Sequence, residues 1–477
     1  MTKTIFEKSQ KDQHAYSLPK DSSEFQQHKP PKDLMRHAAL ELPEMSEIDL
    51  TRHFCELARK NMGIDTHFYP LGSCTMKFNP RVNELCAGFP GFTRTHPFAS
   101  DETVQGNLQI IHELLEMLCC ISGMSAGTLL PNAGAQGEYV GIRMIGAYHR
   151  KRGDIERTEI LIPDSAHGTN PATAAIAGFK TISIRTNREG DMDLDELHRM
   201  TTERTAGLML TNPNTLGLFS PVIGDIASIL HKKGGLLYYD GANLNAIMEI
   251  AKPGAMGFDV MHMNLHKTFS TPHGGGGPGS GPVLCNDKLK PFLPVPYVEK
   301  DGHGSYRTIW KDMDSIGNIA SFHGNFGIYL RAYLYIKLHG YFGLRRISEQ
   351  AVLNANYLKT RLSKLFTIPF SQFCMHEFVV QADNYLSEGV KALDIAKRLL
   401  DYGIHAPTIY FPLIIKECML IEPTESESKN TLDRFVAVME KIIEEILTNP
   451  AIVKSAPHTL AVKRLDEVLA ARNISKI

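Results

Sequence analysis

Lys267 follows a short apolar run, VMHM (260–263), and precedes a segment in which six of the eight residues 274–281 are glycine. A lysine at a strand end, beside a loop whose backbone can approach a phosphate, has the layout of a lysine that forms a Schiff base. Such a lysine must lose its proton near neutral pH, although its ordinary pKa is about 10.4, and burial or a nearby cation is the usual means. The alternative is a surface lysine beside a turn.

Two other patterns in this stretch indicate different chemistry, and neither is supported by its context. Residues 274–279 match G-x-G-x-x-G, but Pro278 and the strand expected after it do not give the helix start that a dinucleotide site needs. His262 and His266 would share a metal only on a helix, whereas the pattern predicts a strand and a turn. We therefore expect no metal here.

Asp240 ends the apolar run GGLLYY, which places a carboxylate at the carboxyl edge of a predicted sheet. Open α/β sheets bind ligands at that edge. A carboxylate there could keep a pyridine nitrogen protonated, the state in which pyridoxal phosphate withdraws electrons. A turn Asp before Gly241 is the simpler alternative.

Three further segments follow predicted strands and could contact the same cofactor. Ala133, Gly134 and Ala135 in PNAGAQGE (131–138) open a helix whose small side chains would let a phosphate approach its N–H groups. His167 in PDSAHGTNP (163–171) could stack on a cofactor ring, and Thr215 in TNPNT (211–215) could reach a ring hydroxyl. Ordinary helix caps and turns are the alternatives.

The order of these features is more specific than each feature alone. A phosphate loop near residue 134, a histidine at 167, an aspartate at 240 and a lysine at 267 resemble the chain order of fold-type-I pyridoxal-phosphate enzymes. The resemblance implies an α/β fold and pyridoxal 5′-phosphate bound as a Schiff base to Lys267.

The elements that must position these residues form an alternating pattern of apolar runs and helical segments. The predicted strands are 127–130, 159–162, 181–184, 208–210, 236–239, 260–263 and 282–284. The predicted helices include 107–121, 135–150, 171–177, 193–201 and 222–232. Such alternation is typical of a mostly parallel sheet covered on both faces.

The pattern predicts three parts. Residues 1–104 contain a polar arm that needs another surface to order it and a proline- and glycine-rich loop segment at 65–100. Residues 105–330 would be the large α/β domain, and residues 331–477 a long helix with a small α+β domain.

Composition excludes several classes of protein. The formal net charge is −1, with 51 Lys and Arg against 52 Asp and Glu, which argues against binding to nucleic acid. No apolar run is long enough to span a membrane, and the N-terminus lacks the apolar core of a secretory signal. The eight cysteines form no C-x-x-C pair, so we expect a cytoplasmic protein with most of its thiols in the core.

Five motifs give a closer resemblance: YPLGSCTMKFNP (69–80), PNAGAQGEY (131–139), DSAHGTNPA (164–172), YYDGANLNA (238–246) and LHKTFSTPHGGGGPGSGP (265–282). They resemble motifs of glycine decarboxylase, the P-protein of the glycine cleavage system. The match runs over most of the chain but corresponds to the C-terminal half of the single-chain form.

The resemblance implies a split P-protein, in which a related chain without the lysine is subunit 1. It implies decarboxylation of glycine, with transfer of the aminomethyl group to the oxidised lipoyl arm of the H-protein. His266 and Ala242 would join the cofactor site. Ser73, Cys74 and Thr75 would contact the substrate, with a packing or hydrogen-bonding role for Cys74.

Some roles stay open. His167, His266 and His273 all lie near the inferred ring and could move a proton. Arg81 and Arg94 lie near the substrate loop only in sequence, so no carboxylate-binding arginine is assigned. The rival functions are another fold-type-I enzyme (an amino-acid decarboxylase or a desulfurase) and a non-catalytic structural subunit.

Overall fold

A seven-stranded sheet forms the centre of the computed structural model, which describes residues 3–15, 31–38, 40–273 and 279–473. The strands are β1 (Ala126–Thr128), β2 (Glu159–Pro163), β3 (Lys180–Ile184), β4 (Thr205–Leu210), β5 (Leu236–Gly241), β6 (Val260–Met263) and β7 (Val283–Cys285). Their order is β1-β7-β6-β5-β4-β2-β3. The five neighbouring strands β3, β2, β4, β5 and β6 are parallel, and β7 pairs antiparallel with both β6 and β1. All seven predicted strands are therefore confirmed to within a few residues.

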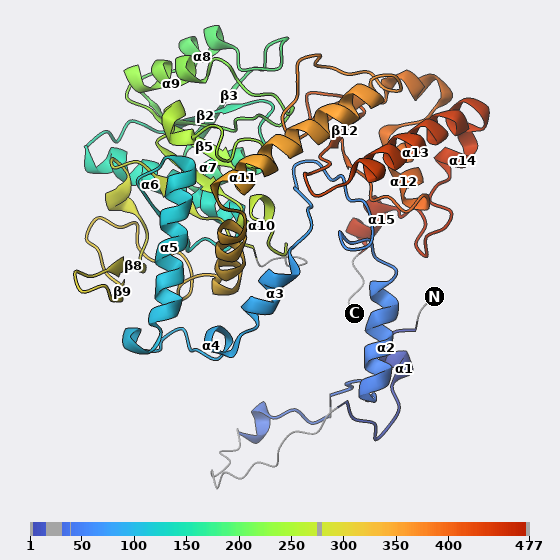
Figure 1. Cartoon of the computed structure of the whole chain (residues 1–477), viewed down its shortest axis with the longest axis horizontal. Helices are drawn as coiled ribbons and strands as arrows, with labels where there is room; N and C mark the ends of the chain where they lie inside the picture. Colours follow the sequence, from blue (N-terminus) through green and yellow to red (C-terminus); the bar gives the residue numbers. More distant parts are fainter. Residues whose placement is uncertain (1–2, 16–30, 39, 274–278, 474–477) are drawn as a thin grey trace. The chain divides into compact units, whose positions relative to one another are not determined.

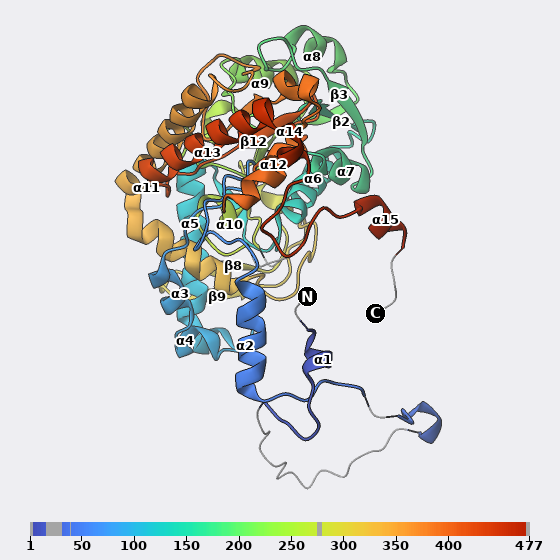
Figure 2. The same ribbon diagram turned by 90° about the vertical axis from the view of Figure 1, so that its right-hand side faces the viewer.

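Helices cover both faces of the sheet because each central strand is apolar on both sides (Figures 1 and 2). One face packs against α5 (Gln105–Ser122), α8 (Leu194–Met200), α9 (Ile223–Lys232) and the long α11 (Phe326–Leu362). The other face packs against α6 (Gly134–Lys151) and α7 (Thr169–Ile176). The predicted fold class, the fold-type-I α/β fold with a mostly parallel sheet, is confirmed.

A smaller antiparallel sheet follows α11, which is interrupted at Gly340, where φ is 58°. The sheet has the order β10-β12-β11, with strands β10 (Phe378–Gln381), β11 (Thr408–Ile409) and β12 (Cys418–Ile421). It packs against the second half of α11 and against α12 (Ala392–Asp401), α13 (Lys429–Thr448) and α14 (Pro450–Lys454) (Figure 1).

The chain divides into two compact units, residues 1–66 with 457–477, and residues 67–456. The first contains α1 (Ile5–Lys8), η1 (Lys32–Leu34), α2 (Glu47–Ala58) and α15 (Glu467–Arg472). The seven-stranded sheet, the three-stranded sheet and all five hydrophobic clusters lie in the second. The division of the chain at residues 104 and 330 stays a prediction.

Two predictions about local structure are wrong. The segment 65–100 is not all loop, since it contains α3 (Arg81–Ala87) and α4 (Pro90–Thr93). The prolines do not prevent these helices because Pro80 immediately precedes α3 and Pro90 is the first residue of α4, positions that need no backbone N–H.

The cysteines are also less buried than expected, because only Cys285, Cys374 and Cys418 of the eight are in the core. Cys119 and Cys120 are neighbours on α5, where an amphipathic helix places one partly and the other fully toward solvent.

The remaining elements connect these layers. They are η2 (Asp101–Thr103), η3 (Pro253–Met256), α10 (Leu265–Thr268), η4 (Lys290–Phe292), β8 (Tyr297–Lys300), β9 (Tyr306–Ile309) and η5 (Asp383–Glu388). Among the described residues, every helix is too short or too polar to span a lipid bilayer.

Candidate active site

A cavity of about 180 Å³ lies at the carboxyl ends of the parallel strands, within the unit of residues 67–456. Eight of the predicted site residues line it: Ser73, Gly134, Ala135, His167, Thr215, Asp240, Ala242 and Lys267. Residues without a prediction complete the wall, and they include Glu138, Thr169, Asn243, His262, Asn264, His376, Glu377 and Phe411. Ala133, Cys74, Thr75 and His266 are not among the residues that line the cavity.

Lys267 enters the cavity from α10, the single helical turn that follows β6. Its Nζ donates a hydrogen bond to the backbone oxygen of Ser73 at 2.7 Å. Ser73 has a left-handed backbone, with φ of 64°, and its N–H donates to Glu377 at 2.7 Å. The lysine is therefore held by the loop that precedes α3, which links it to a buried carboxyl group.

Asp240 is buried at the end of β5, opposite His262 on β6. Its carboxylate accepts hydrogen bonds from Asn170 Nδ2 at 2.9 Å and from the Ala242 N–H at 3.1 Å, and His262 Nε2 lies at 3.4 Å. Burial raises the pKa of Asp240, but His262, Asn170 and the Ala242 N–H together outweigh it, so that the pKa lies below its usual value. The cavity therefore contains an ionised carboxylate that is fixed in position.

The first turn of α6 forms another part of the wall. Ala133 is the N-cap residue, and no side chain caps this 18-residue helix. A Cβ at Gly134 would come within 2.5 Å of Asn264 Oδ1, an atom that is buried and has no hydrogen-bond partner among the described residues. Free N–H groups, a helix dipole and glycine at the point of closest approach form a cradle that fits a phosphate.

His167 and Thr215 close the cavity on the side of α7. The His167 ring is exposed, lies 2.9 Å by Nδ1 from Thr169 Oγ1, and meets the Phe411 ring edge-on at 5.6 Å. Thr215 is buried and donates its hydroxyl to Ser165 O at 2.6 Å. The Thr215 hydroxyl proton is therefore already used within the protein.

Two histidines next to the lysine are uncharged. Burial lowers the pKa of His266 to about 3 and that of His273 to about 4, and the nearby Lys267 acts in the same direction. His266 Nδ1 accepts the Ser280 N–H at 3.2 Å, so its ring is held as a neutral acceptor. Neither ring is set up to carry a proton at neutral pH.

The loop 73–75 lies against a pair of buried carboxyl groups from the smaller sheet. Glu422 Oε2 accepts the Thr75 N–H at 3.1 Å, and Asn243 donates both to Glu422 and to the Thr75 hydroxyl. Burial raises the pKa of Cys74, so this residue is present as a thiol. The local sequence does not reveal Glu377 and Glu422, because the pairing of two strands far apart in the sequence brings them together.

The glycine-rich segment is only partly within the described residues, because 274–278 lie outside them. The segment 279–281 packs beside the loop before α6, with the Gly281 N–H donating to Pro131 O at 2.8 Å. A Cβ on Gly281 would lie 2.2 Å from the backbone oxygen of Ala133. Glycine is therefore required at 281 for the two loops to meet.

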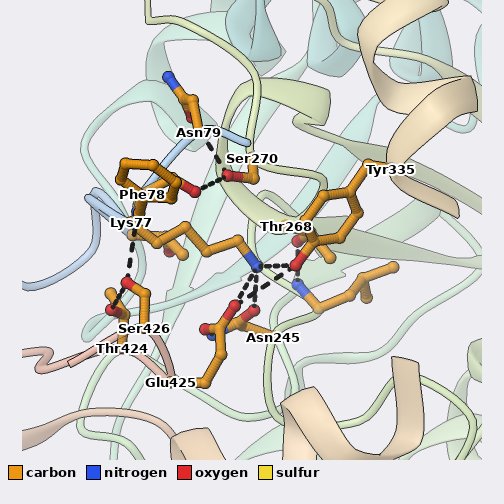
Figure 3. Close-up of polar contacts among 12 residues, drawn as sticks. Lys77, Phe78, Asn79, Asn245, Thr268, Ser270, Tyr335, Thr424, Glu425 and Ser426 are labelled. Atoms are coloured by element: carbon orange, nitrogen blue, oxygen red, sulfur yellow. Dashed lines mark hydrogen bonds and ion pairs between the residues drawn. The ribbon is translucent and has the colours of Figure 1, made fainter. Parts of the chain in front are cut away.

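Lys77, a buried lysine that the sequence did not reveal, holds the loop before α3 in place (Figure 3). Lys77 Nζ lies 2.9 Å from Glu425 Oε1, and it donates to Asn245 Oδ1 at 2.9 Å and Tyr335 Oη at 3.2 Å. In the same view Ser270 donates to the backbone oxygen of Phe78. These contacts join the loop before α3 to α11, to the loop after β5 and to the loop after β12.

Comparison with known proteins places this geometry in a family. The family model of the glycine cleavage system P-protein matches residues 7–305, and that of the glycine dehydrogenase C-terminal domain matches residues 347–458. A protein of Caldanaerobacter subterraneus subsp. tengcongensis named "Probable glycine dehydrogenase (decarboxylating) subunit 2" is 54% identical over 475 residues, which are 98% of this chain and 97% of the relative. The chain belongs to the P-protein family of the glycine cleavage system.

Further similarities agree with this membership. A protein of the same name from Staphylococcus epidermidis is 54% identical over 98% of this chain and 93% of its own length. A crystal structure of glycine decarboxylase (P-protein) in inhibitor-bound form has a TM-score of 0.72 at 19% identity, covering 86% of this chain and 93% of that one. The predicted P-protein family and the predicted enzyme class, glycine dehydrogenase (decarboxylating), are thereby confirmed.

Proposed function

We propose that this chain catalyses the pyridoxal-phosphate-dependent decarboxylation of glycine and transfers the aminomethyl group to the oxidised lipoyl arm of the H-protein. It would do so with glycine dehydrogenase subunit 1 as its partner. The names of the close relatives support glycine as substrate and a second subunit. The observation that carries the proposal is that Lys267 and Asp240 line one cavity with the uncapped start of α6.

The cavity residues fit the polar groups of pyridoxal phosphate. The N–H groups at the start of α6, around Ala133, Gly134 and Ala135, would bind the phosphate. Lys267 would hold the aldehyde carbon, and the ionised Asp240 would keep the pyridine nitrogen protonated. When bound, the cofactor takes up the electron pair that loss of CO2 leaves on the substrate.

The surrounding residues would keep these groups in place. The Ala242 N–H orients the Asp240 carboxylate. His167 would cover one face of the cofactor ring, and Thr215 would shape the wall near its hydroxyl. The neutral His266 would border the lysine without adding a positive charge.

The substrate side of the cavity suits a small amino acid with a weakly held carboxylate. We assign Ser73 to the substrate contact, with Cys74 and Thr75 holding its loop. None of the described residues that line the cavity is an arginine, so Arg81 and Arg94 are not part of the wall. Decarboxylation gains from a carboxylate that is not tightly solvated.

The cysteines disfavour the desulfurase alternative, which needs a reactive thiol after the lysine. Cys285, Cys374 and Cys418 are all buried. Burial raises the pKa of Cys374 to about 12 and that of Cys418 to about 11, so both stay protonated and unreactive.

One experiment tests the cofactor and the lysine together. The chain is purified with its partner, its absorbance spectrum is recorded before and after borohydride, and the reduced product is mapped by peptide analysis. We expect an absorbance band that borohydride removes. The reduced pyridoxyl group should then be found on the peptide that contains Lys267, and it should be absent from the variant Lys267→Met. Labelled glycine, glutamate and cysteine then identify the substrate.

A contrary result has a clear meaning. If no pyridoxal phosphate binds even with the partner present, the enzymatic proposal fails and the chain is a structural subunit. If glutamate or cysteine is the preferred substrate, a different fold-type-I reaction replaces the one proposed.

A further inference from the structure

Glu377 and Glu422 lie opposite each other at one end of the paired strands β10 and β12. Phe378 of β10 pairs with Ile421 of β12, so these two glutamates occupy the next positions on the two strands. Their relative exposures are 4% and 0%, and a carboxylate oxygen of each lies within 4.8 Å of the other. Like charges directly opposite in a sheet are destabilising, and two close buried carboxyl groups do not both ionise. One proton must therefore be shared by the pair.

The hydrogen bonds decide where this proton resides. Glu422 accepts from the Thr75 N–H and from Asn243, at 3.1 and 2.9 Å, whereas Glu377 accepts from the Ser73 N–H. Two donors favour the ionised form of Glu422 more than one donor favours that of Glu377. Burial raises the pKa of Glu422 to about 7, and burial with the charge of Glu422 raises the pKa of Glu377 well above its usual value. The proton is thus on Glu377, the member of the pair that lines the cavity.

The other titratable groups around the pair cannot take its place. His376 Nε2 lies 3.7 Å from Glu377 Oε1, but burial lowers the pKa of His376 to about 3, so the ring is neutral. Cys74 is a thiol because burial raises its pKa. Lys267 faces the pair through the backbone of Ser73.

The stoichiometry of the proposed reaction moves one proton from glycine to a lipoyl sulfur, and this inference rests on that function. The electron pair freed by loss of CO2 forms a bond between the glycine Cα and one lipoyl sulfur. The disulfide bond breaks and is reduced, and the other sulfur leaves as a thiolate. Glycine enters with three hydrogens on nitrogen, and two remain in the aminomethyl group. The third balances the thiolate, which becomes a thiol.

We propose that the Glu377–Glu422 pair is the store for this proton. Glu377 gives its proton to the leaving thiolate, and the ammonium group of the next glycine restores it. Glu377 is then a catalytic acid, and Glu422 is a positioning residue that keeps Glu377 protonated.

The test compares Glu377→Gln and Glu422→Gln with Glu440→Gln, a control on the exposed face of α13. Infrared spectroscopy of the complex in D2O, without substrate, measures the carbonyl stretch of a buried protonated carboxyl group. We expect this band in the wild type and in Glu440→Gln and its loss in Glu377→Gln. In Glu422→Gln it should titrate at lower pH, because the neighbouring charge is gone. This second variant also tests the pair if Glu377→Gln does not fold.

The second measurement is single-turnover formation of the aminomethylated H-protein. We expect a decrease of about 100-fold or more in Glu377→Gln, the usual effect of removing a general acid, with partial rescue in Glu377→Asp. The wild-type rate should fall as rising pH removes the shared proton, and the rate of Glu377→Gln should lack this pH dependence.

Several results would overturn the inference. The first is an infrared band that is unchanged in Glu377→Gln, and the second is a transfer rate of Glu377→Gln within twofold of the wild type. The third is one equivalent of a divalent cation that the wild type binds and Glu377→Gln does not, since a cation would replace the shared proton. Failure of the proposed function itself differs from these, because the wild type would then show no glycine-dependent transfer while the infrared band still reported on the pair. In that case the shared proton would stand and its catalytic role would fall.

Discussion

At the scale of single residues, Lys77 is the clearest case of a buried charge whose loss of hydration its partners must offset. Its side chain is 1% exposed, and its principal partner is Glu425, whose side chain is 11% exposed. Removing the lysine leaves a buried carboxylate without its cation. We expect Lys77→Met to lower the free energy of unfolding by about 3–5 kcal/mol near neutral pH, measured by urea denaturation.

The sign of the pH dependence follows from Glu425. Burial raises its pKa, but Lys77 and Asn245 outweigh burial and hold the pKa below its usual value. The pair therefore adds stability above the ordinary pKa of glutamate and loses it as pH falls, so the deficit of Lys77→Met should shrink in acid. The double variant Lys77→Met/Glu425→Gln should recover part of the loss. If the double variant is as unstable as the single one, packing rather than charge explains the effect.

At the scale of elements, the start of α6 and the loop before β7 are in close contact. A Cβ at Gly281 would lie 2.2 Å from the Ala133 backbone oxygen, and a backbone atom cannot turn aside as a side chain can. We expect Gly281→Ala to cost about 1–3 kcal/mol of stability and to weaken retention of pyridoxal phosphate, because the phosphate cradle must shift. Gly106→Ala on α5, where nothing lies within 4 Å of the new Cβ, is the matched control. Equal cofactor retention in the two variants would show that the cradle does not depend on this contact.

The sequence predicts elements well where a local pattern encodes them. The central strands β2, β4, β5 and β6 are mostly apolar runs, and α5, α6 and α9 carry helical periodicity, so these elements are predictable. Segment 81–93 carries a loop pattern because prolines usually interrupt helices, but Pro80 and Pro90 stand at helix starts, where a proline fits. The facing of Glu377 and Glu422 depends on the register of two strands far apart in sequence, which no local pattern encodes.

At the scale of the whole molecule, the candidate site belongs to one of the two units. Every residue that lines the cavity lies between residues 67 and 456, as do all five hydrophobic clusters. The polar segment 1–60, in contrast, carries the pattern of an arm that needs another surface. Folding and cofactor binding should therefore be separable from assembly with the partner subunit.

We expect the fragment 67–456 to fold, to bind pyridoxal phosphate and to show the same borohydride-sensitive band as the full chain. Its association with subunit 1 should be weaker by tenfold or more, because the surface that orders the arm would be supplied by the partner. Sedimentation of equimolar mixtures measures association, and absorbance at equal protein concentration measures cofactor retention. A fragment that folds and assembles like the full chain would show that the first 66 residues serve neither purpose. A fragment that loses the cofactor would show that the two units fold as one.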